Sequence, residues 1–296
     1  MSATTPRTLG DFLSWAEQAF IKAKIYFGHG TNNAWDEAVA LAMAVLDLPS
    51  DVDASITERL LTPNEDKVLT ELAQRRIKDR IPLPYLSHVA WFSGLKFYVD
   101  ENVIIPRSPL AEVIEHRFQP WWGSHRPVKR ILDLCTGSGC IAIACAYAFP
   151  GAEIDAVDIS KEALSVARKN VSLHHCENQL HLLQSDLFQA CSGKRYDIII
   201  SNPPYVSEQE MGSLPKEYQW EPPLALVAGQ EGLAVVEKII NDAPNYLNEG
   251  GLLIVEVGNS QEALQKARPH TPFIWLEFEH GGEGVFLLTK EDLACG

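Results

Sequence analysis

The 296-residue chain is poor in basic residues, in long apolar runs and in paired cysteines. It carries 25 Lys and Arg against 39 Asp and Glu, a formal net charge of −14. A protein that binds nucleic-acid backbones through a broad basic surface is therefore not expected. The longest apolar run, residues 140–149, has ten residues and is too short to span a membrane. The composition fits an acidic globular protein of one or two domains.

The cysteine pattern offers no disulfide framework and no zinc ribbon. Six cysteines stand at positions 135, 140, 145, 176, 191 and 295, and none forms a Cys-x-x-Cys pair. Reduced thiols are the simplest interpretation. The group His174, His175, Cys176 and His181 meets no known metal-ligand spacing, so no metal site is expected. The first residues show no apolar stretch behind a basic one, and we expect no secretory signal and a cytoplasmic location.

The negative charge is concentrated in the C-terminal part of the chain. Residues 1–107 hold 11 basic and 14 acidic side chains, whereas residues 108–296 hold 14 and 25. The basic cluster of Arg75, Arg76, Lys78 and Arg80 is interpreted as the solvated face of a helix end rather than as a nucleic-acid site. This distribution favours a neutral or basic partner.

The hydrophobic pattern predicts a helical domain over residues 1–80 and a joint over residues 81–107. Apolar residues of the first segment recur at three- and four-residue steps: Leu9, Phe12, Leu13, Ala16, Phe20 and Ile21. A later helix is expected to begin at Thr62, with Pro63 in the first helical position and Glu65 completing a capping box. In the joint, Ser93-Gly94 between two apolar runs predicts a β-hairpin.

From about residue 108 to 296 the pattern changes to alternating strands and helices. Strands are predicted at 129–134, 153–158, 180–184, 196–201, 251–257, 273–278 and 284–289, and helices at 109–118, 139–148, 160–174, 231–247 and 260–268. This order predicts an α/β fold with an open, doubly wound and mostly parallel sheet. Only His280-Gly281-Gly282-Glu283 separates the last two strands, and so short a connection forces them to be antiparallel.

A glycine-rich turn follows the first strand of this sheet. Cys135-Thr136-Gly137-Ser138-Gly139 lies between strand and helix, where glycines let a ligand approach the backbone and the helix offers free N–H groups. Asp158 stands 19 residues after Gly139 at the end of the second strand, where a carboxylate accepts hydrogen bonds from ribose hydroxyls. The glycine turn and Asp158 together predict a nucleoside-containing cofactor at the carboxyl ends of the strands.

The identity of that cofactor is left open by the glycine turn. Gly137-x-Gly139-x-x-Ala142 also fits a dinucleotide fingerprint, so a nicotinamide enzyme is an alternative. Two features favour S-adenosylmethionine. Asp133 is placed to meet an amino-acid ammonium, which a nicotinamide dinucleotide lacks. Asp186 after the third strand would reach an adenine amino group, with Leu187 covering the ring, although Asp186 also suits a helix cap.

The most specific motif is Asn202-Pro203-Pro204-Tyr205, directly after the fourth strand. Successive prolines fix the chain and place carbonyl groups outside the sheet ladder, and Asn202 adds a side-chain acceptor. These acceptors together suit a planar –NH₂ group, and the ring of Tyr205 is available to stack on it. Hydrogen bonds from both N–H groups would raise the electron density on such a nitrogen and orient it for methyl transfer.

The order of these motifs resembles the class I methyltransferases that act on amide or exocyclic amino nitrogens. The helical N-terminal domain, the hairpin joint, Ile105-Pro106-Arg107 and Glu221-Pro222-Pro223 are similar to the N(5)-glutamine methyltransferases over nearly the whole chain. The resemblance implies a Rossmann-like seven-stranded sheet with the last strand antiparallel. It also implies a substrate-recognition domain at 1–80, a β-hairpin linker at 81–107 and a catalytic domain at 108–296.

The same resemblance implies the site residues. Those predicted to bind S-adenosylmethionine are Asp133, Cys135, Thr136, Gly137, Ser138, Gly139, Asp158, Ile159, Asp186 and Leu187. Those predicted to act in catalysis are Asn202, Pro203, Pro204 and Tyr205, with Asn202 and Pro203 binding the glutamine amide. No metal is expected in this chemistry.

Two branches of the family are known, one modifying peptide release factors and the other ribosomal protein number three of the large subunit. The release-factor branch usually has Pro-Arg-Pro-Asp/Glu-Thr-Glu in the connector and glycine where this chain has Cys135. This chain has Pro106-Arg107-Ser108-Pro109 instead, and it resembles the ribosomal-protein branch. The expected partner is therefore a large-subunit ribosomal protein, before or during assembly, without a membrane or strong nucleic-acid binding.

Three alternatives stay open at this point. A release-factor glutamine methyltransferase shares all the motifs. An adenine-N(6) methyltransferase on DNA or RNA shares the Asn-Pro-Pro-Tyr chemistry, but the negative charge counts against it. A non-catalytic binding module on the ribosome would have no need of intact Gly137, Gly139, Asp158 and Asn202.

Overall fold

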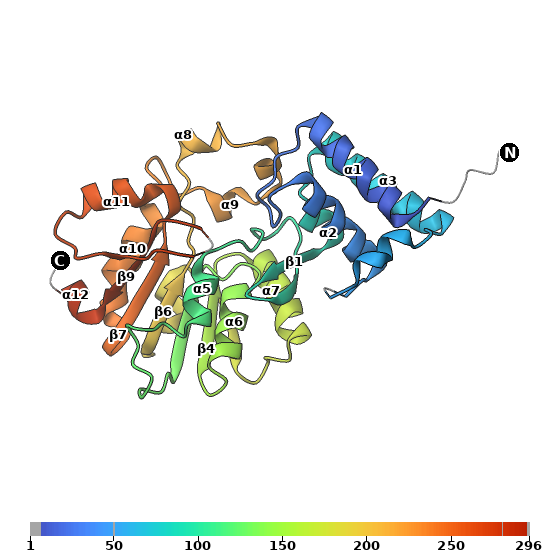
Figure 1. Ribbon diagram of the computed structural model, residues 1–296. Coiled ribbons are helices and arrows are strands. Elements are labelled where there is room, and N and C mark those ends of the chain that lie inside the picture. Colours follow the sequence, from blue (N-terminus) through green and yellow to red (C-terminus); the bar gives the residue numbers. More distant parts are fainter. Residues whose placement is uncertain (1–6, 50, 280, 295–296) are drawn as a thin grey trace. The chain divides into compact units, whose positions relative to one another are not determined.

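The computed structural model describes residues 7–49, 51–279 and 281–294 (Figure 1). The predictions that concern Cys295 and His280 therefore lie outside the described residues. The chain divides into two compact units. The helical unit contains the chain up to Ala90 together with Pro215–Trp220, and the sheet unit contains Trp91–Leu214 and the chain from Glu221 onward.

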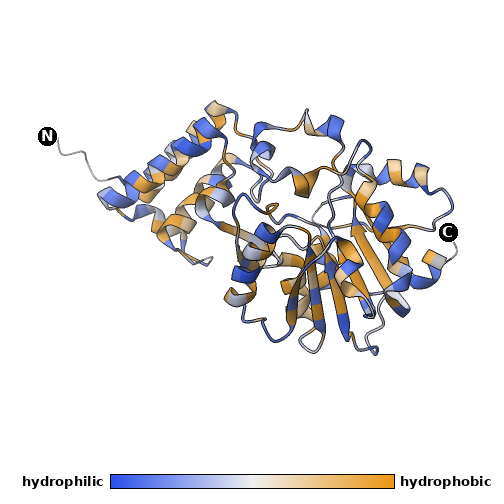
Figure 2. Cartoon of the chain, turned by 180° about the vertical axis from the view of Figure 1, so that it is seen from behind, coloured by the Kyte–Doolittle hydropathy of each residue, from blue (hydrophilic) through white to orange (hydrophobic). Residues whose placement is uncertain are grey.

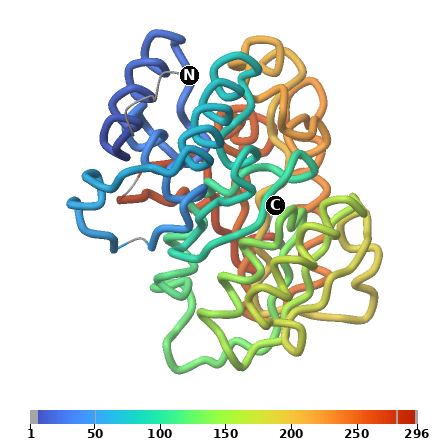
Figure 3. Tube along the Cα trace, turned by 90° about the vertical axis from the view of Figure 1, so that its right-hand side faces the viewer, coloured from blue at the N-terminus to red at the C-terminus, as the bar shows by residue number. Residues whose placement is uncertain are grey.

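The helical unit is built from four α-helices and two short 3₁₀ turns in the described residues. They are α1 (Leu9–Ala23), α2 (Ala34–Leu46), η1 (Ala54–Glu58), α3 (Pro63–Asp79), α4 (Leu83–Ser87) and η3 (Lys216–Trp220). The blue and cyan coils of the trace in Figure 3 follow α1 to α3. Phe12, Phe20 and Leu69 are fully buried between these helices. The apolar spacing therefore predicted the core face of α1 correctly, except at Ile21, which is 54% exposed.

The predicted helix start at Thr62 is confirmed. Its hydroxyl accepts a hydrogen bond from the Glu65 N–H (3.3 Å), and the Glu65 carboxylate accepts one from the Thr62 N–H (2.9 Å), with Pro63 in the first turn. This reciprocal pair satisfies two N–H groups that the helix itself leaves without acceptors. Helix α3 ends at Asp79, before Ile81-Pro82, as expected. Beyond Pro82 the chain forms the short helix α4, which the sequence did not predict.

The interpretation of the basic cluster as a solvated helix face is wrong for Arg76. Arg75 and Lys78 are exposed, but Arg76 is only 1% exposed and its Nε lies 2.6 Å from Oε1 of Glu37. A buried guanidinium is tolerated only where carboxylates and carbonyl groups compensate the loss of water. Those partners come from other segments of the chain, so local sequence did not indicate them.

The predicted β-hairpin is confirmed. β1 (Val89–Phe92) and β2 (Leu95–Tyr98) form a two-stranded sheet, and both residues of the turn, Ser93 and Gly94, have positive φ (50° and 71°). Positive φ at both central positions matches the twist of a hairpin. The division between the two units falls within β1.

The sheet unit contains the predicted seven-stranded sheet. Its strands are β3 (Arg130–Leu134), β4 (Glu153–Asp158), β5 (Leu180–Gln184), β6 (Tyr196–Ser201), β7 (Leu247–Glu256), β8 (Ile274–Trp275) and β9 (Val285–Thr289). The order across the sheet is β5-β4-β3-β6-β7-β9-β8. β3 to β7 are parallel, whereas β9 is antiparallel to both β7 and β8, as predicted for the last strand.

Helices cover both faces of this sheet (Figure 1). The helices of this unit in the described residues are α5 (Leu110–Glu115), α6 (Cys140–Ala148), α7 (Lys161–Leu173), α8 (Glu208–Met211), α9 (Pro223–Leu226), α10 (Ala234–Asp242), α11 (Gln261–Ala267) and α12 (Lys290–Ala294), with 3₁₀ turns η2 (Leu187–Cys191), η4 (Ala243–Asn245) and η5 (Gly258–Ser260). The sequence did not predict α8, α9 and α12, which are only four or five residues long. β7 also begins earlier than expected, through a polar and glycine-containing stretch that does not have a strand pattern.

Alternate strand residues form two cores. Ile198 and Ile200 belong to the core under α5 and α6, whereas Ile199 belongs to the core under α10 and α11. Successive strand side chains point to opposite faces, so a sheet covered on both sides needs continuous apolar strands. Figure 2 shows the strands mostly in orange, while the helices of the helical unit alternate between orange and blue bands.

The strand order places one reversal at the centre of the sheet. From β3 the chain proceeds outward to β4 and β5, and it then returns to β6 on the other side of β3. The Ser201 hydroxyl at the end of β6 donates to the Leu134 carbonyl at the end of β3 (2.7 Å) and holds the two strand ends together. In open α/β sheets, ligands bind outside the carboxyl ends of strands at such a reversal.

None of the helices within the described ranges combines the length and apolar character that a bilayer crossing requires.

The fully buried Asn170 on α7 connects three backbone segments of the sheet unit. Its Oδ1 accepts from the Tyr98 N–H (2.8 Å), and its Nδ2 donates to the carbonyls of Tyr98 and Ser138 (both 2.9 Å). We predict that Asn170→Ala lowers the free energy of unfolding by roughly 2–4 kcal/mol, because it leaves these groups without partners in a buried place. Denaturant unfolding measures this effect, with Ser172→Ala on the exposed face of α7 as the control. Equal stability of the two variants would contradict the assigned role.

Candidate active site

The sheet unit has a cavity of about 190 Å³ at the carboxyl edge of the sheet. Its lining includes residues directly after four neighbouring strands, namely Cys135 after β3, Ile159 after β4, Ser185 after β5 and Asn202 after β6. The cavity therefore lies at the reversal in strand order.

The lining is largely apolar with a few polar groups. Beside Cys135, Gly137, Asp158, Ile159, Asp186, Leu187, Asn202 and Pro204, it contains Asn102, Val103, Ile104, Val157, Ser160, Ala163, Ser185, Pro222, Leu224, Ala225, Val227, Val235 and Lys238. Eight of the predicted site residues are thus brought together around one space. Within the described chain, the lining does not include Asp133, Thr136, Ser138, Gly139, Pro203 or Tyr205.

The carboxylate of Asp158 holds the glycine turn at the end of β4. Its Oδ2 accepts from the Gly137 N–H and its Oδ1 from the Ser160 N–H, both at 2.9 Å. Burial raises the pKa of Asp158, and these backbone hydrogen bonds act against that rise. A carboxylate has more acceptor sites than two donors use, so Asp158 keeps capacity for a ligand that enters the cavity.

Gly139 allows the turn to run directly into helix α6. It has φ +82°, and a Cβ at this position would lie 3.3 Å from the Cβ of Ala167 on α7. A larger residue would therefore meet both backbone strain and a crowded helix contact. Gly139 therefore allows the turn to pack against α7, and it does not line the cavity.

Asp133 lies beneath the turn rather than in the lining. It is fully buried, and its Oδ2 accepts from the Thr136 hydroxyl (2.5 Å) and the Ala142 N–H (3.1 Å). Its Oδ1 is buried without a hydrogen-bond partner in the described part of the chain. Burial raises the pKa of Asp133 from 3.8 to about 7. The side chain thus has one acceptor available for a donor that reaches this point.

Cys135 occupies the first position of the turn in a left-handed conformation, with φ +60°. Such a conformation costs a residue with a Cβ roughly 1–2 kcal/mol, which glycine does not lose. Burial raises the pKa of the Cys135 thiol, with nearby Asp158 and Asp133 adding to the effect. The thiol therefore lines the cavity as a neutral, weakly polar group.

Asp186 and Leu187 lie together at the end of β5. Asp186 is exposed at the edge of the cavity and Leu187 is buried. Asp186 stands at the start of the 3₁₀ turn η2, but its side chain forms no capping hydrogen bond there. Its carboxylate is therefore not used as the helix cap that the sequence left open as an alternative.

Asn202, Pro203 and Pro204 leave the sheet at the end of β6. Asn202 and Pro204 line the cavity, and Pro203 between them is buried. Asn202 therefore lines the same cavity as Asp158 and Asp186. In the sequence it lies 44 residues after Asp158 and 16 residues after Asp186. This gathering of acceptor groups follows from the parallel strands.

Tyr205 is held by contacts other than the stacking that the motif suggested. Its hydroxyl donates to Oε1 of Glu256 (2.9 Å), and its carbonyl accepts from the Ser260 hydroxyl (2.8 Å). A Cβ at Gly258 would lie 2.6 Å from its ring. Burial raises the pKa of Glu256, whose Oε2 accepts from the Ser108 hydroxyl at 2.5 Å. The ring and its hydroxyl thus fix the end of the Asn202–Tyr205 motif.

Sequence reasoning did not identify the wall of the cavity formed by residues 102–104 and 222–227. The two segments are joined by Arg107 and Glu221, whose side chains form paired contacts of 2.5 and 2.7 Å. The Glu221 carboxylate also accepts from the Ile105 N–H (3.1 Å). The charged residues Arg107 and Glu221, each beside a proline, were visible in the sequence, but their pairing across 114 positions was not.

His174, one of the residues considered as a metal site, forms hydrogen bonds through both ring nitrogens. Nδ1 of His174 lies 3.2 Å from the hydroxyl of Tyr147, and its Nε2 lies 2.9 Å from the carbonyl of Lys96. Both ring nitrogens therefore take part in hydrogen bonds that attach α7 to α6 and to the hairpin.

Comparison with known proteins gives concordant results. The family model described as methyltransferase small domain matches residues 123–214. The chain is 45% identical over 286 residues to a ribosomal protein uL3 glutamine methyltransferase of Francisella tularensis subsp. tularensis, covering 97% of this chain and 91% of that protein. It is 42% identical over 287 residues to the protein of the same name from Bordetella pertussis, covering 97% and 96%.

Among solved structures, the chain is similar to the hMettl16 catalytic domain in complex with MAT2A 3′UTR hairpin 6. The TM-score is 0.52 at 17% identity, with 85% of this chain and 91% of that chain covered. At this identity the similarity shows the fold alone.

The raised pKa of Asp133 predicts a dependence of stability on pH. Between about pH 4 and 7 the folded protein binds this proton more tightly than the unfolded chain does. Stability therefore falls as pH rises through this range, by up to about 1.4 kcal/mol per pH unit. We predict that Asp133→Asn flattens the pH dependence of the unfolding free energy in the ligand-free protein. Denaturant unfolding at several pH values measures it, and the same slope in both proteins would rule out the assignment to Asp133.

Proposed function

The chain belongs to the ribosomal protein uL3 glutamine methyltransferase family, and we propose that it methylates a glutamine side-chain amide of uL3 with S-adenosylmethionine as the donor. The observation that carries this proposal is the sharing of one cavity by Asp158, Asp186 and Asn202. The first two suit a nucleoside, and Asn202 suits the amide that is to be modified.

The residues of the cavity fit S-adenosylmethionine. We assign the ribose to Asp158, which has acceptor capacity left, and the adenine to Asp186 with Ile159 and Leu187 as apolar cover. Oδ1 of Asp133, which is buried and has no hydrogen-bond partner among the described residues, is suited to a cationic donor such as an ammonium group. Bound in this way, the cofactor supplies an electrophilic methyl group on a sulfonium.

Asn202 and Pro203 provide what a glutamine amide needs. The lone pair of an amide nitrogen is delocalised, so the nitrogen is a weak nucleophile. We assign the Asn202 side-chain oxygen and the Pro203 carbonyl as acceptors for its two N–H groups, which raises electron density on the nitrogen and fixes its orientation. Such positioning lowers the activation free energy without a strong base.

Charge supports a protein substrate rather than a nucleic acid. Residues 108–296 hold 14 basic and 25 acidic side chains, and an acidic surface attracts a basic protein and repels phosphate groups. Association with uL3 should therefore slow as the salt concentration rises. We further propose a cytoplasmic enzyme that acts on uL3 before or during ribosome assembly, while the glutamine is accessible.

A transfer assay with labelled S-adenosylmethionine tests the proposal against its alternatives. The acceptors are free uL3, a peptide release factor, adenine-containing DNA and RNA, and assembled large subunits. Label on a glutamine of free uL3 is expected. Preferential labelling of the release factor or of adenine would replace the proposed substrate, and label on assembled subunits alone would reverse the proposed timing.

The role of Asn202 can be tested separately from cofactor binding. We predict that Asn202→Ala lowers methyl transfer by at least about a hundredfold, because an acceptor for the reacting amide is lost. The dissociation constant of S-adenosylmethionine, measured by calorimetry, should change by less than about threefold. Asn259→Ala, at an exposed asparagine of the same unit, is the matched control. Near-normal transfer by Asn202→Ala would remove the residue from the proposed mechanism.

A further inference from the structure

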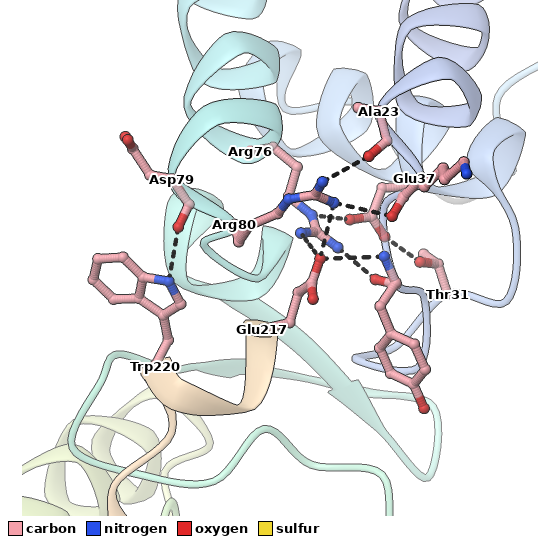
Figure 4. A network of polar contacts seen from close by, with 10 residues as sticks. Ala23, Thr31, Glu37, Arg76, Asp79, Arg80, Glu217 and Trp220 are labelled. Atoms are coloured by element: carbon pink, nitrogen blue, oxygen red, sulfur yellow. Dashed lines mark hydrogen bonds and ion pairs between the residues drawn. The ribbon is translucent and has the colours of Figure 1, made fainter. Parts of the chain in front are cut away.

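Buried carboxylates pair with arginines in both units of the described chain. In the helical unit, the buried side chains of Arg76 and Glu37 form such a pair (Figure 4). In the sheet unit, the carboxylate of Glu221 pairs with Arg107, and Glu221 is only 1% exposed. The second pair lies beside the cavity, because Glu221 directly precedes the wall segment 222–227.

The Arg107 guanidinium places one nitrogen on each oxygen of the Glu221 carboxylate. Nη1 lies 2.5 Å from Oε1, and Nη2 lies 2.7 Å from Oε2. Oε1 of Glu221 also accepts from the Ile105 N–H (3.1 Å), and Nη1 of Arg107 lies 3.4 Å from the Ile105 carbonyl oxygen. A guanidinium that contacts both carboxylate oxygens forms a strong and directional pair. The pair therefore contacts Ile105 at both of its backbone polar groups.

This ion pair joins two segments of the cavity wall that are not strands of the sheet. Residues 102–104 form a turn and a loop, and most of segment 222–227 is the short helix α9. Ile105, which the Glu221 carboxylate binds, directly follows Ile104 of the lining. Because neither segment belongs to the strand ladder, the ladder does not set the spacing between them.

Other contacts hold the outer ends of the two segments. Oδ1 of Asp100 accepts from the Asn102 N–H (3.1 Å) and from its side-chain amide (2.9 Å). The Val206 N–H donates to the Leu226 carbonyl (2.8 Å), and the Ala228 N–H donates to the Val206 carbonyl (3.0 Å). These bonds hold each segment separately, whereas the ion pair joins one segment to the other. Its loss should therefore loosen the wall without unfolding it.

We propose that Arg107 and Glu221 are positioning residues for methyl transfer, because their ion pair sets the spacing of the two wall segments and thus the space left for the reacting groups. The inference rests on the proposed function of the cavity. Ile104 and Pro222 line the same cavity as Asn202, so a shift of either changes the space beside the residue assigned to the amide. All of these residues belong to the sheet unit.

The test uses the full chain with single and double variants of the pair. Glu221→Gln keeps the shape of the side chain and removes its charge, and the remaining guanidinium reaches solvent because the Arg107 side chain is 25% exposed. Arg107→Lys keeps the charge and loses the two-pronged contact. The matched controls are Arg130→Lys and Glu153→Gln. These residues form a more exposed ion pair (2.6 Å) at the amino ends of β3 and β4, away from the cavity.

Hydrogen–deuterium exchange reports on the wall independently of activity. In Glu221→Gln we expect faster exchange over residues 102–110 and 221–227, with unchanged exchange in β3 and β6. The control variants should exchange like the wild-type protein. Exchange that rises equally over the whole sheet unit would make the pair a general stabiliser and would overturn the proposal.

Kinetics at saturating uL3 measures the effect on the reaction. In Glu221→Gln we expect kcat to fall roughly ten- to hundredfold, because small displacements around reacting groups are costly in rate. Arg107→Lys should fall less, since it keeps a charge opposite Glu221. The double variant should stay within about threefold of Glu221→Gln, because both changes break one interaction. The dissociation constant of S-adenosylmethionine should change by less than about threefold.

The outcomes separate positioning from stability. Local faster exchange together with a loss of kcat that does not multiply in the double variant supports the positioning role. Normal kcat in Glu221→Gln, equal losses in the control variants, or losses that multiply in the double variant overturn it. If wild-type protein does not methylate uL3, the proposed function fails, while the exchange data still show whether the pair fixes the two segments.

Discussion

The parallel arrangement of β3 to β6, with the reversal of strand order between β3 and β6, is the constraint on which the site depends. It brings the carboxyl ends of four strands to one edge, and each strand is followed by a residue that lines the same cavity. The Ser201–Leu134 hydrogen bond maintains the two strand ends at the reversal. Without this arrangement, Asp158 and Asn202 would be unrelated polar residues.

Buried polar groups do the finer positioning around the cavity. Asp158 binds the glycine turn, Asn170 connects α7 to that turn and to β2, and Glu256 holds Tyr205. Asn170 and Glu256 are buried and Asp158 is half-buried, so their hydrogen bonds are costly to break and specify one arrangement. The raised pKa values of Asp133, Asp158 and Glu256 are a consequence of this burial.

Much of the fold followed from local rules, and the exceptions have physical reasons. The seven strands, the hairpin and the capping box at Thr62 were predicted because they depend on short-range periodicity and turn chemistry. Helices α8, α9 and α12 were missed because four or five residues are too few to show a helical period. Arg76 was misassigned because its carboxylate partners, Glu37 and Glu217, lie 39 and 141 positions away.

For the candidate site, the sequence by itself determined which residues stand at the ends of the strands and which chemistry their motif favours. Glycines after a strand, an aspartate after the next and Asn-Pro-Pro after the fourth are local patterns, and they can be recognised without a structure. Only the tertiary structure decided that the Tyr205 hydroxyl donates to Glu256 and that Arg107 pairs with Glu221 beside the cavity. It also decided that Pro215–Trp220 belong to the helical unit. These contacts join residues far apart in the chain, and their stability comes from burial, which no local pattern records.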